Sequence, residues 1–141
     1  MTVFHSTRHF VQSPTAVYAA LATPDRLKRW WGPAGFTNTF RVCDIRPGGT
    51  WVLTMHGPDG KDYHNVAEFL EVEPDRKMVI RHSCAPYFTL TIHLTAEDGG
   101  TRVTWEQAFD SAEVAAAVRP IVEPANEQNL DRWQSELVAG D

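Results

Sequence analysis

Apolar and polar residues alternate along much of this 141-residue chain, a pattern typical of strands with one buried face. The clearest case spans residues 88–95. We expect its apolar members to be buried, and these are Phe88, Leu90, Ile92 and Leu94. We expect the polar members between them to lie on the solvent side of a sheet, and these are Thr89, Thr91, His93 and Thr95.

Three segments rich in glycine, proline and acidic residues predict turns between such strands, at residues 46–49, 73–76 and 97–100. Treated as four-residue loops, they predict which residues lie opposite one another in neighbouring strands. The expected inward pairs are Asp44–Trp51, Val42–Leu53, Phe40–Met55, Phe69–Ile80, Ala67–His82, Leu94–Val103, Ile92–Trp105, Leu90–Gln107 and Phe88–Phe109. This largely apolar face predicts an antiparallel meander with one buried side.

A fourth turn segment, at residues 57–60, does not fit this scheme. A four-residue loop there would place Trp51 on the same face as Glu68. We therefore expect a longer loop or a β-bulge at this point.

The N-terminal part of the chain predicts one strand and two short helices. Residues 2–11 form the strand, whose inward face stays open between Phe4/Ser6/Arg8/Phe10 and Val3/His5/Thr7/His9. The dipeptides Ser13-Pro14 and Thr23-Pro24 each combine a helix-capping residue with a proline suited to the first helical position. The second helix is expected to end near Trp31, where Gly32 and Pro33 follow.

The C-terminal segment predicts the helix that covers the inward face of the sheet. Leu130, Trp133 and Leu137 form an apolar stripe at helical spacing, which Val122 and Asn126 extend toward the N-terminus. Because Pro120 and Pro124 each remove a backbone hydrogen bond, we expect a helix over 112–119, a break, and a second helix over 124–138.

Composition and charge exclude several classes of protein. The net charge of -5 and the pI of about 5.6 argue against a nucleic-acid partner. The sequence contains no run of 18 or more apolar residues, which a membrane span would need. The first ten residues lack the apolar core of a signal peptide. We therefore expect a cytoplasmic single domain covering residues 1–141, with Cys43 and Cys84 reduced.

Several motifs resemble a known family when they are taken in order. They are Trp30-Trp31-Gly32-Pro33, the segment from Asp44 to Trp51, Gly57-Pro58-Asp59-Gly60, Glu71-Val72-Glu73-Pro74 and Gly100-Thr101-Arg102-Val103. From about residue 4 to 110 the chain is similar to the bacterial proteins named after the activator of the heat-shock protein 90 ATPase. That group belongs to the SRPBCC superfamily, which includes START domains and birch-pollen-type allergens.

The resemblance implies an α+β helix-grip fold. In this fold a curved antiparallel sheet of about seven strands wraps on a C-terminal helix, and two short helices follow the first strand. It also implies a small-ligand-binding role. The proline-rich start of the C-terminal segment departs from the family pattern, and we expect it to open an entrance between helix and sheet.

The candidate ligand-binding residues are those expected on the inward side. They are Trp30, Trp51, Met55, Phe69, His82, Phe88, Trp105, Gln107, Asn126 and Trp133. For the aromatic members, the alternative is plain core packing. His82 either orients a ligand, acts as a general base, or is a core histidine bonded to a neighbour. Asn126 either bonds a ligand or satisfies a carbonyl freed by one of the prolines.

The sequence indicates no metal site, cofactor or catalytic nucleophile. His5 and His9 are four residues apart on one predicted strand, which separates them by about 13 Å. Cys84 stands beside Ala85 and Pro86 without a local activating pattern.

The leading hypothesis is therefore the binding of a small apolar or amphipathic molecule between sheet and helix, without catalysis. One alternative is a cyclase- or hydrolase-like enzyme that uses the same pocket, with His82 as acid or base. Contact between His82 and a carboxylate such as Asp44 would favour this enzyme. Another is a co-chaperone-like interaction module, which a filled interior would favour. The sequence also leaves a homodimer open.

Overall fold

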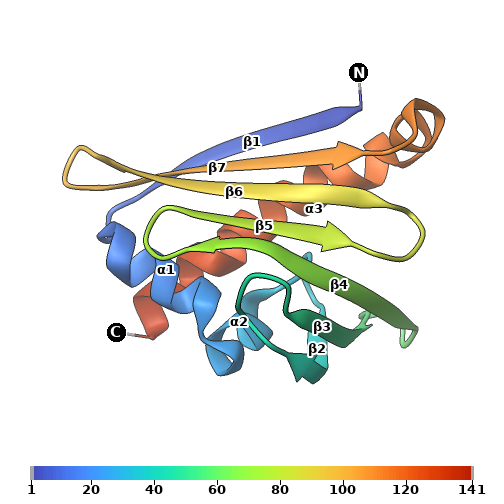
Figure 1. Ribbon diagram of the computed structural model, residues 1–141, viewed down its shortest axis with the longest axis horizontal. Helices are drawn as coiled ribbons and strands as arrows, with labels where there is room; N and C mark the ends of the chain where they lie inside the picture. The colour runs from blue at the N-terminus through green and yellow to red at the C-terminus, as the bar shows by residue number, and fades with distance from the viewer. Residues whose placement is uncertain (1, 141) are drawn as a thin grey trace.

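The structure is a computed structural model that describes residues 2–140, and it has the expected helix-grip architecture (Figure 1). Its elements, in chain order, are β1 (Val3–Phe10), α1 (Pro14–Ala22), α2 (Pro24–Trp30), β2 (Thr37–Cys43), β3 (Thr50–His56), β4 (Asp62–Glu73), β5 (Lys77–His82), β6 (Phe88–Glu97), β7 (Gly100–Phe109) and α3 (Ala112–Ala139). The strands form one antiparallel sheet in the order β1-β7-β6-β5-β4-β3-β2. In Figure 1, α3 crosses behind this sheet and covers its inner face. None of the described helices is both long and apolar enough to span a membrane.

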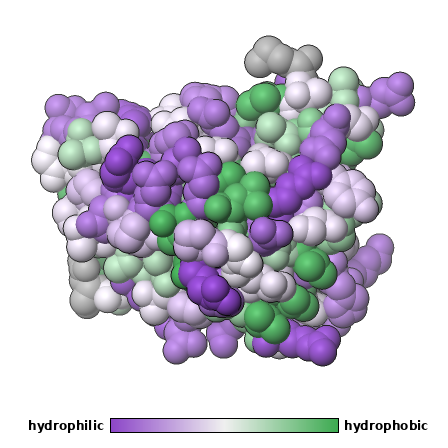
Figure 2. Space-filling view, in the orientation of Figure 1, coloured by the Kyte–Doolittle hydropathy of each residue, from purple (hydrophilic) through white to green (hydrophobic). Residues whose placement is uncertain are grey.

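The faces of β1 and β6 follow the alternation in the sequence. In β1, Phe4 and Phe10 are buried, which settles the inward face that the sequence left open. In β6, the expected apolar residues point inward, although Phe88 is only half-buried. Of the polar residues between them, Thr95 is exposed, whereas Thr89, Thr91 and His93 are half-buried. Figure 2 shows the outer face of the sheet, where hydrophilic side chains surround a central hydrophobic patch.

The β6–β7 hairpin has the predicted register, with Leu94 opposite Val103 and Leu90 opposite Gln107. The turn itself is shorter than expected, because Glu97 already pairs with Gly100. Asp98 and Gly99 make the turn with φ angles of 49° and 77°. Two consecutive positive φ angles match the right-handed twist of the flanking strands, which favours this tight turn.

The loop between β3 and β4 is longer than four residues, as predicted. His56 pairs with Asp62, so the loop comprises residues 57–61. This length places Trp51 opposite Ala67, and both side chains are buried.

The predicted register of the β2–β3 hairpin is wrong. Beside the turn the pairing is shifted by one residue, so that Cys43 lies opposite Trp51, and a β-bulge between Phe40 and Val42 adds a second shift, so that Phe40 lies opposite Leu53. The one-residue shift beside the turn changes which side chains of that section point inward. Val42 is consequently 41% exposed.

Asp44 was expected on the inward face opposite Trp51, and this prediction is also wrong. Its carboxylate pairs with the guanidinium of Arg46 at 2.7 Å and is 42% exposed. Asp44 therefore contributes to the turn and not to the interior.

The predicted register of the β4–β5 hairpin is right away from the turn and wrong beside it. Val72 pairs with Met78 and not with Lys77, because the turn has one residue fewer than expected. A bulge between Phe69 and Glu71 then restores the predicted pairing of Phe69 with Ile80. The two irregularities cancel, so the inward face of the longer part of β4 is as predicted.

Both short helices begin at the predicted positions. The hydroxyl of Ser13 accepts a hydrogen bond from the backbone N–H of Ala16 at 3.2 Å, and Pro14 opens α1. Thr23 ends α1 and precedes Pro24 of α2, although its side chain makes no capping bond. Ser111 caps α3 in the same way as Ser13 caps α1, through the N–H of Val114.

The predicted break in the C-terminal helix is absent, and α3 is one helix of 28 residues. Both Pro120 and Pro124 lie on its exposed face. Water therefore has access to the backbone carbonyls that the missing proline N–H groups leave unpaired, and the helix continues. The first half of α3 is not lifted from the sheet, since Ala115 is fully buried against Phe4 and Phe109.

We predict that Trp133→Ala lowers the free energy of unfolding by about 3–5 kcal/mol, the usual range for truncating a buried aromatic. Trp133 is fully buried, stacks on Trp30 at 4.6 Å between ring centroids and contacts the ring of Phe10. Urea unfolding measures the change, with Val138→Ala on the exposed face of α3 as the control. A loss below about 1 kcal/mol in Trp133→Ala would contradict the covering role of α3.

Candidate functional site

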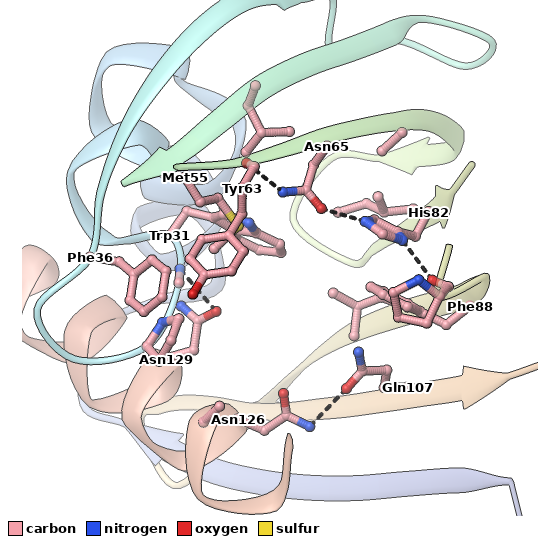
Figure 3. A pocket seen from close by; sticks show the side chains of 18 of the residues that line it. Trp31, Phe36, Met55, Tyr63, Asn65, His82, Phe88, Gln107, Asn126 and Asn129 are labelled. Carbon is pink, nitrogen blue, oxygen red and sulfur yellow. Dashed lines mark hydrogen bonds between the residues drawn. The ribbon is translucent and has the colours of Figure 1, made fainter. Parts of the chain in front are cut away.

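A cavity of about 480 Å3 lies between α3, the connection from α2 to β2, and the inner face of the sheet (Figure 3). Most of its wall is apolar. It is lined by Trp31, Gly32, Pro33, Phe36, Trp51, Leu53, Met55, Tyr63, Asn65, Ala67, Ile80, His82, Pro86, Phe88, Leu90, Trp105, Gln107, Ile121, Ala125, Asn126 and Asn129.

Seven of the ten candidate residues line this cavity, namely Trp51, Met55, His82, Phe88, Trp105, Gln107 and Asn126. The other three belong to the filled core. Trp30 stacks on Trp133 and donates its indole N–H to the carbonyl of Ala20 at 3.0 Å. Phe69 is fully buried behind Trp51, with 5.4 Å between the ring centroids.

Sequence reasoning missed much of the remaining lining, above all residues 31–36. One signal for this segment was present in the pair Trp30-Trp31. Trp30 is the last residue of α2 and Trp31 follows with an extended backbone, so Trp30 enters the core while Trp31 lines the cavity. Tyr63 and Asn65 were missed because they lie beyond the segment of β4 for which the register was predicted.

The guanidinium group of Arg132 holds residues 31–36 in place. From α3 it donates to the backbone carbonyls of Trp31, Gly32 and Pro33, at 2.9–3.0 Å. It also donates to the carbonyls of Arg29 and Phe36, at 3.0 and 2.8 Å. Burial lowers the pKa of Arg132, but a guanidinium remains charged at neutral pH.

Two side-chain amides of α3 complete this anchoring. Asn129 accepts from the backbone N–H of Gly32 and donates to the carbonyl of Trp30, both at 3.2 Å. Gln128 accepts from the N–H of Ala34 at 3.1 Å. Side chains of α3 thus bond many of the backbone groups of the cavity-lining connection.

His82 occupies one end of the cavity and stacks on Phe88, with 4.4 Å between the ring centroids. Its Nδ1 lies 2.7 Å from the carbonyl oxygen of Pro86, and its Nε2 lies 2.5 Å from Oδ1 of Asn65. Burial is the largest influence on the His82 pKa and lowers it, whereas the hydrogen bond to Pro86 raises it. Among the described residues, no carboxylate contacts this imidazole. The contact with a carboxylate that would favour the enzyme hypothesis is therefore not found among them.

A second polar group lies across the cavity from His82. The Nδ2 of Asn126 on α3 donates to Oε1 of Gln107 on β7 at 3.0 Å, and both residues are 8% exposed. Asn126 therefore bonds a side chain of the sheet and not a carbonyl freed by proline. The indole N–H groups of Trp51 and Trp105 are buried without a hydrogen-bond partner among the described residues.

The cavity opens beside the first half of α3. Ile121 contributes to its wall and is 71% exposed, and Tyr63 across the opening is 43% exposed. The exposed rim of the cavity therefore lies near the two prolines, but the helix is neither broken nor lifted there, so the expected opening by a lifted helix is wrong.

The structure adds little support for metal or thiol chemistry. Over residues 2–140, no three histidine, cysteine or acidic side chains come close enough together to hold a metal ion. Both cysteines are free. Burial raises the pKa of the Cys43 thiol to about 12, and Cys84 places its Sγ 3.6 Å from Nε2 of His82.

Comparison with known proteins identifies relatives by sequence and by fold. Residues 12–137 match the family described as Activator of Hsp90 ATPase homolog 1-like protein. No curated protein matches the chain.

Many solved structures share the fold. A Nitrosomonas europaea protein is 21% identical with a TM-score of 0.89, over 99% of this chain and 96% of that one. A Mycobacterium smegmatis protein is 25% identical with a TM-score of 0.81, over 98% and 89% of the two chains. The AHSA1 protein of Silicibacter pomeroyi is 17% identical with a TM-score of 0.80, over 99% of both chains.

We predict that Arg132→Lys lowers the free energy of unfolding by about 1–3 kcal/mol, because lysine cannot reproduce the planar fork that reaches five carbonyls. Arg119→Lys is the matched control, since Arg119 lies on the same helix and is 48% exposed. Urea unfolding of both variants checks the prediction. Equal stabilities would contradict the anchoring role of Arg132.

We predict that His82 makes the fold less stable in mild acid. Because the folded-state pKa of His82 is lowered, the unfolded chain binds the proton more readily as the pH falls through about 6.5. The free energy of unfolding should therefore decrease from pH 7.5 to pH 5.5, and by less in His82→Gln. Urea unfolding at both pH values measures the two decreases, and the other five histidines are common to both proteins. An equal decrease in both would show that His82 does not carry this dependence.

Proposed function

Because the chain belongs to the family of Activator of Hsp90 ATPase homolog 1-like proteins, whose fold is known for ligand binding, we propose that it binds a small apolar or amphipathic molecule. The site is the cavity between α3 and the sheet. The observation that carries this proposal is the cavity itself, with its aromatic and aliphatic wall and few polar groups.

The volume of the cavity suits a ligand of moderate size. Pockets for small molecules commonly enclose roughly 300–1,000 Å3, and this one encloses about 480 Å3. Rings of Trp31, Phe36 and Phe88 offer flat apolar surface on different sides of the space. Each Å2 of apolar ligand surface removed from water there contributes about 25 cal/mol.

The wall is also held rigidly enough to present a defined shape. Residues 31–36 are anchored by Arg132, Asn129 and Gln128, and the opposite wall is the sheet. A preformed cavity binds with a smaller entropic loss than one that must be ordered by its ligand.

The two alternative functions have less support. A cyclase or hydrolase would need an acid or base with a proton relay, and His82 contacts an amide and a backbone carbonyl. An interaction module would need no cavity of this size. Neither alternative explains the apolar space as directly as ligand binding does.

We predict that the protein binds the uncharged fluorescent probe N-phenyl-1-naphthylamine, and that Ala125→Trp weakens this binding at least tenfold. Ala125 lines the cavity, so an indole at this position occupies the space of the probe. Ala116→Trp is the matched control, because Ala116 lies on the same helix and is exposed. Probe fluorescence and thermal unfolding are measured together.

Two results would contradict the proposal. One is a folded wild-type protein that binds no apolar probe. The other is equal binding by the Ala125→Trp and Ala116→Trp variants, which would place the probe outside the cavity.

A further inference from the structure

The cavity wall carries no fixed charge. Among the described residues that line it, none is aspartate, glutamate, lysine or arginine. The guanidinium of Arg132 is occupied by the carbonyls of the loop behind the wall. Burial lowers the pKa of His82, so its neutral form predominates near pH 7. An ion placed here would lose its hydration without gaining a counter-charge, so the wall selects an uncharged ligand.

Gln107 and Asn126 offer this ligand one hydrogen-bond donor and one acceptor. Their mutual bond uses Nδ2 of Asn126 and Oε1 of Gln107. This leaves Oδ1 of Asn126 and Nε2 of Gln107, for which the described residues provide no partner. Figure 3 shows both atoms turned toward the open space of the cavity.

This pattern does not depend on how the two amide groups are oriented. A side-chain amide has a donor end and an acceptor end. Whichever end of Asn126 bonds to Gln107, one residue retains its donor end and the other its acceptor end. Turning both amides exchanges the two positions but still leaves one donor beside one acceptor.

We propose that the cavity recognises an uncharged molecule through an adjacent N–H or O–H donor and carbonyl acceptor, the pattern of a lactam or imide edge. The ligand N–H donates to Asn126, and the ligand carbonyl accepts from Gln107. The rest of the ligand lies against the aromatic wall. This inference rests on the proposed binding function and defines its ligand class.

A purely structural role for the Gln107–Asn126 bond makes a different prediction. The bond joins α3 to β7, so it contributes to stability in either case. Only recognition makes the two residues responsible for selectivity between ligands of equal size. Selectivity is therefore the quantity to measure.

The experiment compares four tricyclic probes of similar size by calorimetry at pH 7.5. They are 6(5H)-phenanthridinone, which is a lactam, its N-methyl derivative, the hydrocarbon phenanthrene, and phenanthrene-9-carboxylate. We expect the lactam to bind at least tenfold more tightly than its N-methyl derivative, because methylation removes the donor and leaves the acceptor of Asn126 unpaired. We expect the carboxylate to bind more weakly than the lactam.

Variants assign this selectivity to the two residues. In the double variant Gln107→Met/Asn126→Leu, which leaves neither amide, the lactam and its N-methyl derivative should bind within about twofold of each other, and phenanthrene should still bind. Gln134→Met, on the exposed side of α3, is the control and should retain the wild-type ratio. Thermal unfolding confirms that each variant is folded.

Each result either supports or overturns the inference. If wild type binds phenanthrene but treats the lactam and its N-methyl derivative alike, the donor–acceptor inference fails and the proposed function stands. If the double variant Gln107→Met/Asn126→Leu keeps the wild-type ratio, the assignment to these two residues fails. Tighter binding of the carboxylate overturns the selection of uncharged ligands. If none of the probes binds, the proposed function fails together with this inference.

Discussion

The structure depends on how α3 satisfies the backbone of the connection between α2 and β2. Within residues 31–36, Gly32 is buried and Trp31, Pro33 and Phe36 are half-buried between the cavity and α3, so water has limited access to their backbone groups. A buried carbonyl without a partner costs about 1–3 kcal/mol. The guanidinium of Arg132 supplies donors to several such carbonyls at once, and a charged donor bonds more strongly than a neutral one. The cavity wall can therefore be an irregular segment without being unstable.

The two halves of α3 contact different parts of the protein. The C-terminal half carries Leu130, Trp133 and Leu137, which fill the core. Near its end, Glu136 accepts from Arg26 and Arg29 of α2, and the hydrogen bond from Arg29 is the main cause of its lowered pKa. The N-terminal half instead places Ile121, Ala125 and Asn126 along the cavity. One helix thus holds the fold together at one end and shapes the cavity wall at the other.

The sequence predicted the sheet well because its two-residue alternation is a local and redundant signal. The β6–β7 register was right even though the turn was two residues shorter than expected, since shortening a loop symmetrically leaves the pairing unchanged. The β2–β3 register was wrong because the pairing is shifted by one residue beside the turn, which reverses every side chain up to the bulge between Phe40 and Val42. No pattern in the sequence marks such a shift.

The cavity was only partly predictable for a related reason. Residues on regular elements, such as Trp105 and Gln107, followed from the register. Residues on the irregular connection, such as Phe36, did not, because their positions depend on Arg132, almost a hundred residues later. Trp30 and Trp133 were assigned to the cavity because an inward direction alone does not distinguish a wall from a filled core. That distinction depends on the three-dimensional packing of all the elements.

The two prolines of α3 reduce the number of backbone hydrogen bonds in the part of the helix beside the cavity. Because Pro120 and Pro124 lack an amide hydrogen, fewer hydrogen bonds hold successive turns together in this section than around Trp133. Local opening of a helix requires less free energy where fewer hydrogen bonds must break. This section is also the one that borders the mouth of the cavity. We therefore expect brief opening of this section to widen the mouth of the cavity, while the tryptophan core at the other end of the helix stays packed.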